Sequence, residues 1–78
     1  MVTVATSFVF YEIPTPATNG VITVFTTDHN YVANSLQVFI DGILRSKTVY
    51  FSETTSTTFT MVSAPDSNES LRVTYIRL

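Results

Sequence analysis

"SLQVFIDGILRS", residues 35–46, contains an Asp-Gly pair between two apolar segments. A type I′ turn needs positive φ at both central residues, which glycine adopts freely and aspartate tolerates. Asp41 and Gly42 therefore predict the two-residue turn of a β-hairpin. The strand before the turn alternates, so three apolar side chains are expected on one face: Leu36, Val38 and Ile40. Phe39 is expected on the other.

The rest of the chain follows the same β-pattern. Val, Ile, Phe, Tyr and Thr suit a pleated, half-buried surface, and no segment combines helical periodicity with helix caps. Asn19 and Gly20 predict a second tight turn. The sequence predicts an all-β fold, a small antiparallel β-sandwich or barrel. About six strands are expected, at residues 3–12, 21–27, 35–41, 43–53, 58–63 and 71–78.

The length of 78 residues allows one domain, with a division at Pro14 and Pro16. Residues 1–13 are predicted to be an N-terminal arm or edge strand, and residues 14–78 a single β-sandwich domain. Both faces of the first strand are apolar: Val4, Phe8 and Phe10 on one, Ala5, Val9 and Tyr11 on the other. We expect this strand to add to a neighbouring subunit at a sheet edge. The alternative is a strand folded back onto its own sheet.

The composition predicts an oligomer. The chain is 45% hydrophobic and 13% charged, about half the usual charged fraction, and its mean hydropathy is +0.27. It contains no Cys and one His, so neither disulfides nor a metal site of thiolates alone or imidazoles alone can form within it. Burial of apolar surface against another chain is the remaining way to stabilise so small a domain. The alternative is an ordinary core with scattered exposed apolar residues.

The charge pattern argues against two classes of partner. The net charge is −2, and Arg45 and Lys47 form the one close basic pair. A nucleic-acid surface would need a stripe of Lys and Arg to neutralise phosphates. No apolar run approaches the roughly 18 residues of a membrane-spanning helix. The apolar N-terminus has no basic segment, so we expect mature structure there and no signal peptide.

No constellation of residues predicts catalysis. His29, between Asp28 and Asn30, could serve as a general base or metal ligand, but no nucleophile motif accompanies it, and a polar loop is the expected role. The carboxylates fall at predicted strand ends and turns, where solvated roles are expected. "DSNES" (66–70) lacks the glycine and spacing of a calcium loop. We therefore expect no enzyme activity, no catalytic or metal-binding residue and no cofactor.

The aromatic residues are the candidate contact residues. Phe25 and Tyr75 are expected in the core, whereas Tyr31, in a loop, and Phe39 are better placed to touch another chain. With the first strand, the predicted interface comprises Val4, Phe8, Phe10, Tyr11, Tyr31 and Phe39. The predicted structural turn residues are Asn19, Gly20, Asp41 and Gly42.

Three segments together resemble a known module. "NGVITVFTT" (19–27), "YVANSLQVFIDGILRS" (31–46) and "TTFTMVSAPDSNESLRVTYI" (57–76) follow one another in the order and spacing of a β-sandwich module common in bacteriophage tail fibres and other virion proteins. The match covers roughly residues 19–76. Asp41 stands where the family more often has Asn, a change that a type I′ turn allows. Residues 43–53 follow the family pattern only loosely.

The resemblance implies a structural or attachment role in a virus particle, usually in multiple copies, with no catalytic residues to carry over. We expect a virion-located capsid decoration or cement protein. Its expected partners are other virion proteins, either the major capsid protein or tail components, together with further copies of itself, without nucleic acid or membrane. The alternative is a tail-fibre or tail-adaptor module that binds a host receptor or glycan, at a shallow pocket around His29 and Tyr31.

Overall fold

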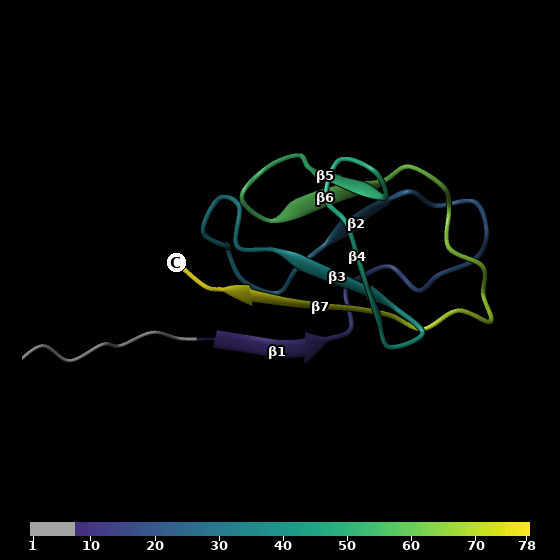
Figure 1. The fold of residues 1–78 in the computed structure, drawn as a ribbon, viewed down its shortest axis with the longest axis horizontal. Coiled ribbons are helices and arrows are strands. Elements are labelled where there is room, and N and C mark those ends of the chain that lie inside the picture. The colour runs from purple at the N-terminus through teal and green to yellow at the C-terminus, as the bar shows by residue number, and fades with distance from the viewer. Residues whose placement is uncertain (1–7) are drawn as a thin grey trace, which may run out of the picture.

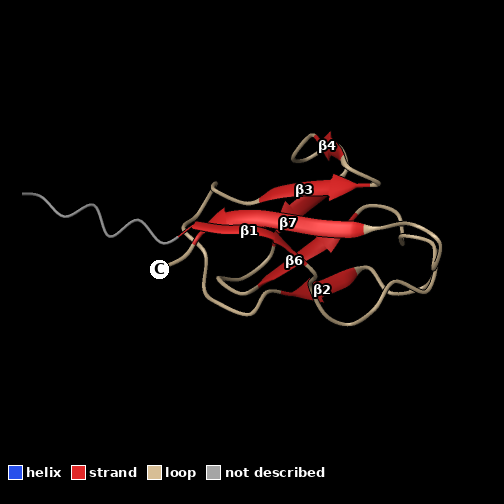
Figure 2. Ribbon diagram, turned by 90° about the horizontal axis from the view of Figure 1, so that it is seen from below, coloured by secondary structure: helices blue, strands red, loops and turns tan. Residues whose placement is uncertain are grey.

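The computed structural model describes residues 8–78, and this part of the chain forms two antiparallel sheets packed face to face (Figure 1). The strands are β1 (Phe8–Glu12), β2 (Val24–Thr26), β3 (Gln37–Ile40), β4 (Ile43–Arg45), β5 (Phe51–Glu53), β6 (Thr58–Met61) and β7 (Leu71–Ile76). One sheet has the order β1-β7-β3-β4, which can be followed in Figure 2, and the other has the order β2-β6-β5. The predicted all-β class and antiparallel sandwich are confirmed.

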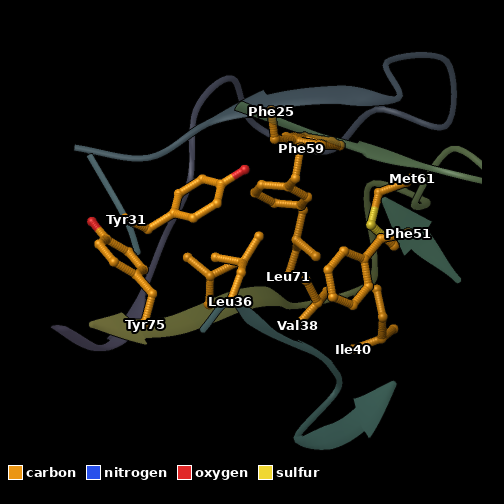
Figure 3. Packing of buried hydrophobic residues seen from close by; sticks show 11 residues of the cluster. Phe25, Tyr31, Leu36, Val38, Ile40, Phe51, Phe59, Met61, Leu71 and Tyr75 are labelled. Atoms are coloured by element: carbon orange, nitrogen blue, oxygen red, sulfur yellow. The ribbon is translucent and has the colours of Figure 1, made fainter. Parts of the chain in front are cut away.

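The core lies between the two sheets (Figure 3). Alternation along β7 turns three side chains inward, and β3 adds two more from the same sheet: Leu71, Val73, Tyr75, Val38 and Ile40. The smaller sheet supplies four that meet them: Phe25, Phe51, Phe59 and Met61. Phe25 stacks on Phe59 with ring centroids 5.8 Å apart, and Phe51 meets Phe59 edge-on at 6.3 Å. The alternation predicted for residues 35–41 thus identified the buried face of β3.

The turn expected at Asp41 and Gly42 is present. Their φ angles are 51° and 80°, and Ile40 lies opposite Ile43, as in a two-residue type I′ hairpin. Ser70 holds the turn through two bonds to Asp41: its N–H donates to the Asp41 carboxylate at 2.8 Å, and its carbonyl accepts from the Asp41 N–H. The turn at Asn19 and Gly20 is present as well, with the Asn19 side-chain oxygen accepting from the Val21 and Ile22 N–H groups.

The prediction of one strand over residues 43–53 is wrong. This segment forms β4 in one sheet and β5 in the other, which brings the strands within residues 8–78 to seven. Thr48 has a φ of 69°, its N–H donates to the Phe51 carbonyl, and the Tyr50 N–H donates to the Ser46 carbonyl. The reversal carries the chain between layers, so Phe51 enters the core from the smaller sheet.

Strand β1 belongs to the sandwich. It is the edge strand of the four-stranded sheet, antiparallel to β7, with Phe8 opposite Ile76, Val9 opposite Tyr75 and Glu12 opposite Val73. For residues 8–12 the structure therefore has the edge strand folded onto its own sheet, rather than a separate arm. Val4 lies outside the described residues.

Candidate interaction face

The outer side of the four-stranded sheet carries exposed aromatic and aliphatic side chains. We call this surface the outer aromatic face, and it comprises Phe8, Phe10, Tyr11, Phe39, Leu44 and Ile76. The exposed fractions are 51% for Phe8, 72% for Phe10, 50% for Tyr11 and 54% for Leu44, while Phe39 and Ile76 are half-buried. Contiguous apolar surface of this kind marks sites of contact with other molecules.

A β-bulge concentrates three of these residues on one side of β1. Between Val9 and Glu12 the strand has two residues, Phe10 and Tyr11, where β7 has one, Thr74. Tyr11 has a φ of 54°, and its N–H donates to the Thr74 hydroxyl at 3.0 Å. Because of the extra residue, Tyr11 shares the face of Phe10. The expectation that Tyr11 and Phe10 lie on opposite faces is therefore wrong.

Tyr11 crosses the outer aromatic face towards the hairpin. Its ring lies 5.7 Å from the Phe39 ring, and the Arg72 guanidinium stands over it at 5.9 Å. Its hydroxyl lies 3.6 Å from the place where a Cβ on Gly42 would be. Arg72 is the one charged side chain that the strands of residues 8–78 direct to this face. The paired residues Gln37 and Thr74 add uncharged polar groups to it.

Phe8 and Phe10 form the second half of the face. Their rings stack with centroids 5.5 Å apart at the open edge of the sheet. Their order on the strand follows the predicted alternation, whereas the close approach of Tyr11 to Phe39 depends on the bulge. The structure thus brings together four of the predicted interface residues: Phe8, Phe10, Tyr11 and Phe39.

Tyr31 does not join them, and the expectation that it is an exposed loop residue is wrong. It is 2% exposed, and its ring meets Tyr75 edge-on at 6.0 Å within the core (Figure 3). Its hydroxyl donates to the Thr58 carbonyl at 2.6 Å, and its N–H donates to the Ser56 carbonyl. Burial raises the pKa of Tyr31 to about 12, and the negative charge of Glu53 adds to the rise. Tyr31 therefore anchors a loop and offers no exposed ring to a glycan.

Glu12 connects β1 to Tyr75 and to the loop at Asp28 through hydrogen bonds. Its carboxylate accepts from the Tyr75 hydroxyl at 2.6 Å and from the Asp28 N–H at 3.0 Å. The His29 N–H donates to the same tyrosine oxygen at 3.3 Å. Burial raises the pKa of Tyr75 to about 12, and the hydrogen bond and charge of Glu12 add to the rise. The backbone of residues 28–29 is thereby held against β1.

Other carboxylates also hold loop backbone. Glu53 accepts from the Asn34 and Leu36 N–H groups and lies 3.6 Å from the Lys47 ammonium, and Glu69 accepts from the Asp66 N–H. The sequence predicts solvated carboxylates at strand ends, whereas the Glu53 and Glu69 carboxylates accept hydrogen bonds from loop N–H groups. Within residues 8–78, no group of three His, Asp or Glu side chains is placed to hold a metal ion.

A cleft lies at the ends of β3, β4 and β6, beside residues 62–65. It has a volume of about 250 Å³, with Ile40, Met61 and Pro65 among its apolar lining and Arg45 and Glu69 as charged groups. The Arg45 guanidinium lies 5.0 Å from the centre of the Tyr50 ring. No sequence pattern pointed to this cleft, because its walls come from segments far apart in the chain.

Two members of the face were not singled out from the sequence. Leu44 lies opposite Phe39 in the hairpin, and Ile76 lies opposite Phe8. The Asp-Gly turn fixes the register that pairs Leu44 with Phe39, so this residue could have been found from the sequence. Ile76 depends on the pairing of β1 with β7, which no local signal specifies.

No protein-family model, curated protein or solved structure was found to match the chain. In the described part of the chain, no helix is long and apolar enough to cross a membrane.

Proposed function

We propose that this chain is a bacteriophage virion structural protein, a capsid decoration or cement protein that docks on other virion proteins through its outer aromatic face. The exposed aromatic surface on the four-stranded sheet carries this proposal. The order and spacing of the segments that resemble virion β-sandwich modules support it.

The chemistry of the face indicates the kind of partner surface. Its aromatic rings need apolar contacts, and such residues are enriched at the buried centres of protein interfaces. Arg72, held over the Tyr11 ring, donates one N–H to the Leu71 carbonyl, and its remaining N–H groups need a carboxylate or carbonyl oxygen once water is excluded. The partner surface is therefore apolar, with one acceptor group near its centre.

Purified particles test the proposal. Particles produced from the genome that encodes this chain are isolated on a density gradient, and the chain is quantified against the major capsid protein by mass spectrometry. The proposal requires a fixed copy number per particle that survives repeated purification. Complete particles without the chain would overturn it.

A matched pair of variants tests the face itself. Leu44, 54% exposed, lies on the outer aromatic face, while Val24, 47% exposed, lies on the other sheet. Burying the exposed half of a leucine contributes about 1 kcal/mol, so Leu44→Ser should weaken particle binding roughly fivefold. Val24→Ser should bind as the wild type does. Equal binding by both variants would show that the outer aromatic face is not part of the interface.

A second candidate is a tail-fibre or tail-adaptor module that binds a host receptor or glycan. The cleft at Arg45, Tyr50 and Glu69 favours it, since a tyrosine lies beside charged groups that can bond to hydroxyls. Its volume, about 250 Å³, is below the roughly 300–1,000 Å³ of typical ligand sites, which places this candidate second. A glycan array probed with wild type and Tyr50→Ala tests it: binding lost in the variant supports it, and no binding by wild type excludes it.

A further inference from the structure

The edges of the two sheets differ in how they are protected. Thr15 exchanges two backbone hydrogen bonds with Thr26 and so covers β2, while the Thr48 N–H donates to Phe51 and covers β5. β4 has only three residues. β1 has five, and among residues 8–78 no strand lies on its outer side. β1 is therefore the longest open edge of the described fold.

The backbone of β1 is oriented to accept another strand. Ile76 directs its N–H to Ser35 and its carbonyl to Val32, away from β1. Its antiparallel partner Phe8 consequently sits in a non-hydrogen-bonded pair, with its own N–H and C=O pointing outward from the sheet. Alternation turns the backbone groups of Val9 towards β7 and those of Phe10 outward again. The open edge thus offers the backbone groups of Phe8 and Phe10.

The side chains of this edge lack the usual protection against pairing. Native edge strands are commonly protected by an outward-pointing lysine or other charged side chain, or by a proline. β1 has the sequence FVFYE, and its one charged residue, Glu12, turns its carboxylate inward to Tyr75 and Asp28. Phe8 and Phe10 stand exposed and stacked beside these outward-pointing backbone groups. The bulge formed by Phe10 and Tyr11 limits the regular pairing surface to residues 8–10.

We infer that two copies of this chain pair through β1, antiparallel, around a two-fold axis at Val9. In this register Phe8 of each copy forms a hydrogen-bonded pair with Phe10 of the other, and the two Val9 residues face each other in a non-hydrogen-bonded pair. The two four-stranded sheets become one continuous sheet, and four phenylalanine rings gather on its outer side.

A second copy is the occupant because the edge is self-complementary. Its outward backbone groups are symmetric about Val9, it brings no like charges together, and its aromatic pair meets the same pair across the axis. This pairing uses the edge of β1, so it goes beyond the docking of the outer aromatic face and stands even if that proposal fails.

Sedimentation of the purified full chain tests the pairing. The mass should rise with concentration from 8.7 kDa towards twice that value. In the double variant Phe8→Lys, Phe10→Lys, like charges lie opposite each other at two positions, so the chain should stay monomeric while keeping its circular dichroism spectrum. A wild-type monomer at all concentrations, or a dimer that survives the double variant, would overturn the inference.

Engineered cysteines test the register, because the chain has none of its own. Across a non-hydrogen-bonded pair the Cα atoms lie about 4.5 Å apart, within disulfide range, so Val9→Cys should cross-link rapidly under copper–phenanthroline oxidation. The two Phe8 residues would lie about 8 Å apart, given the strand rise and spacing, so Phe8→Cys should cross-link at least tenfold more slowly. Val24→Cys, on the other sheet, is the exposure control. Cross-linking of Val9→Cys no faster than the control would contradict this register.

Discussion

Removal of the Glu12 carboxylate tests whether β1 is an integral part of the sandwich. Glu12 accepts a 2.6 Å hydrogen bond from Tyr75 and a 3.0 Å hydrogen bond from the Asp28 N–H. Hydrogen bonds to a charged group contribute about 1.5–3 kcal/mol each. The Asp28 N–H is exposed and can bond to water instead, whereas the Tyr75 hydroxyl is buried, so the lower end of the sum applies. Glu12→Ala should therefore lower the free energy of unfolding by about 3 kcal/mol.

That loss is large for a domain of this size. At about 0.05–0.15 kcal/mol per residue, 78 residues give a total stability of roughly 4–12 kcal/mol. The melting temperature should fall by roughly 12–24 °C, given about 4–8 °C per kcal/mol for a domain of 60–100 residues. Glu12→Gln keeps an acceptor oxygen but loses the charge, so its free energy of unfolding should fall by about half as much as that of Glu12→Ala. The pKa of Tyr75 should fall from about 12 in both variants, because the charge of Glu12 contributes to its rise.

Urea denaturation followed by far-ultraviolet circular dichroism measures the stability change. The difference in tyrosinate absorbance against pH between wild type and each Glu12 variant measures the change at Tyr75, because the chain has four tyrosines. Asp28→Ala is the control, since the Asp28 side chain is exposed and the hydrogen bond to Glu12 uses the Asp28 backbone N–H, which the variant keeps; it should change stability by less than about 0.5 kcal/mol. A loss in Glu12→Ala no larger than that of the control would show that β1 behaves as a free arm and is not an integral strand of the sandwich.

Three further tests have defined outcomes: two pairs of variants and one pH profile. Gly42→Val should cost about 2 kcal/mol in urea denaturation, because Gly42 has a φ of 80°, while Gly42→Asn should cost less than 1 kcal/mol; equal losses would contradict a type I′ turn. Tyr31→Ala should lower the free energy of unfolding by about 3–5 kcal/mol and Val32→Ala by under 1 kcal/mol. The reverse order would contradict the burial of Tyr31. Raised pKa values of about 12 for Tyr31 and Tyr75, against the ordinary 10, favour the neutral phenols in the fold. Stability should therefore hold up to about pH 10 and then decline by up to about 1.4 kcal/mol per pH unit for each tyrosine until pH 12; a flat profile across this range would contradict their burial.

The parts of the fold that could be predicted depend on local chemistry. Asp41 and Gly42 specify their turn because few residues adopt positive φ, and the turn fixes the register of β3 and β4. Alternation then assigns Val38 and Ile40 to the core and Phe39 to the outer side. In each case the signal lies within a few residues.

The parts that could not be predicted depend on distant partners. Tyr31 stands in a polar segment, and its burial comes from Tyr75 and from the Thr58 carbonyl, 27 residues away. Residues 43–53 look like one strand because both halves are apolar, yet they belong to different sheets. The bulge at Tyr11 depends on Thr74, 63 residues along the chain. Only the pairing of β1 with β7 decides which way the Tyr11 ring points.

The outer aromatic face followed partly from the sequence. Phe8, Phe10 and Phe39 were identified from alternation and from the apolar composition of the first strand. Arg72 and Ile76 could not be assigned to the same surface, because the neighbours of β7 are set by the sheet order β1-β7-β3-β4. A candidate surface of this kind becomes visible when strands distant in sequence lie side by side.

A near-atomic cryo-electron microscopy map of the particle would show whether the chain docks through its outer aromatic face. The domain should be present at every equivalent position, with the β1-β7-β3-β4 sheet against a neighbouring virion protein. Tyr11, Phe39 and Leu44 should be buried there, with an acceptor group facing Arg72. A map in which the domain is present but these side chains face solvent, or in which the domain is missing from the complete particle, would contradict the account.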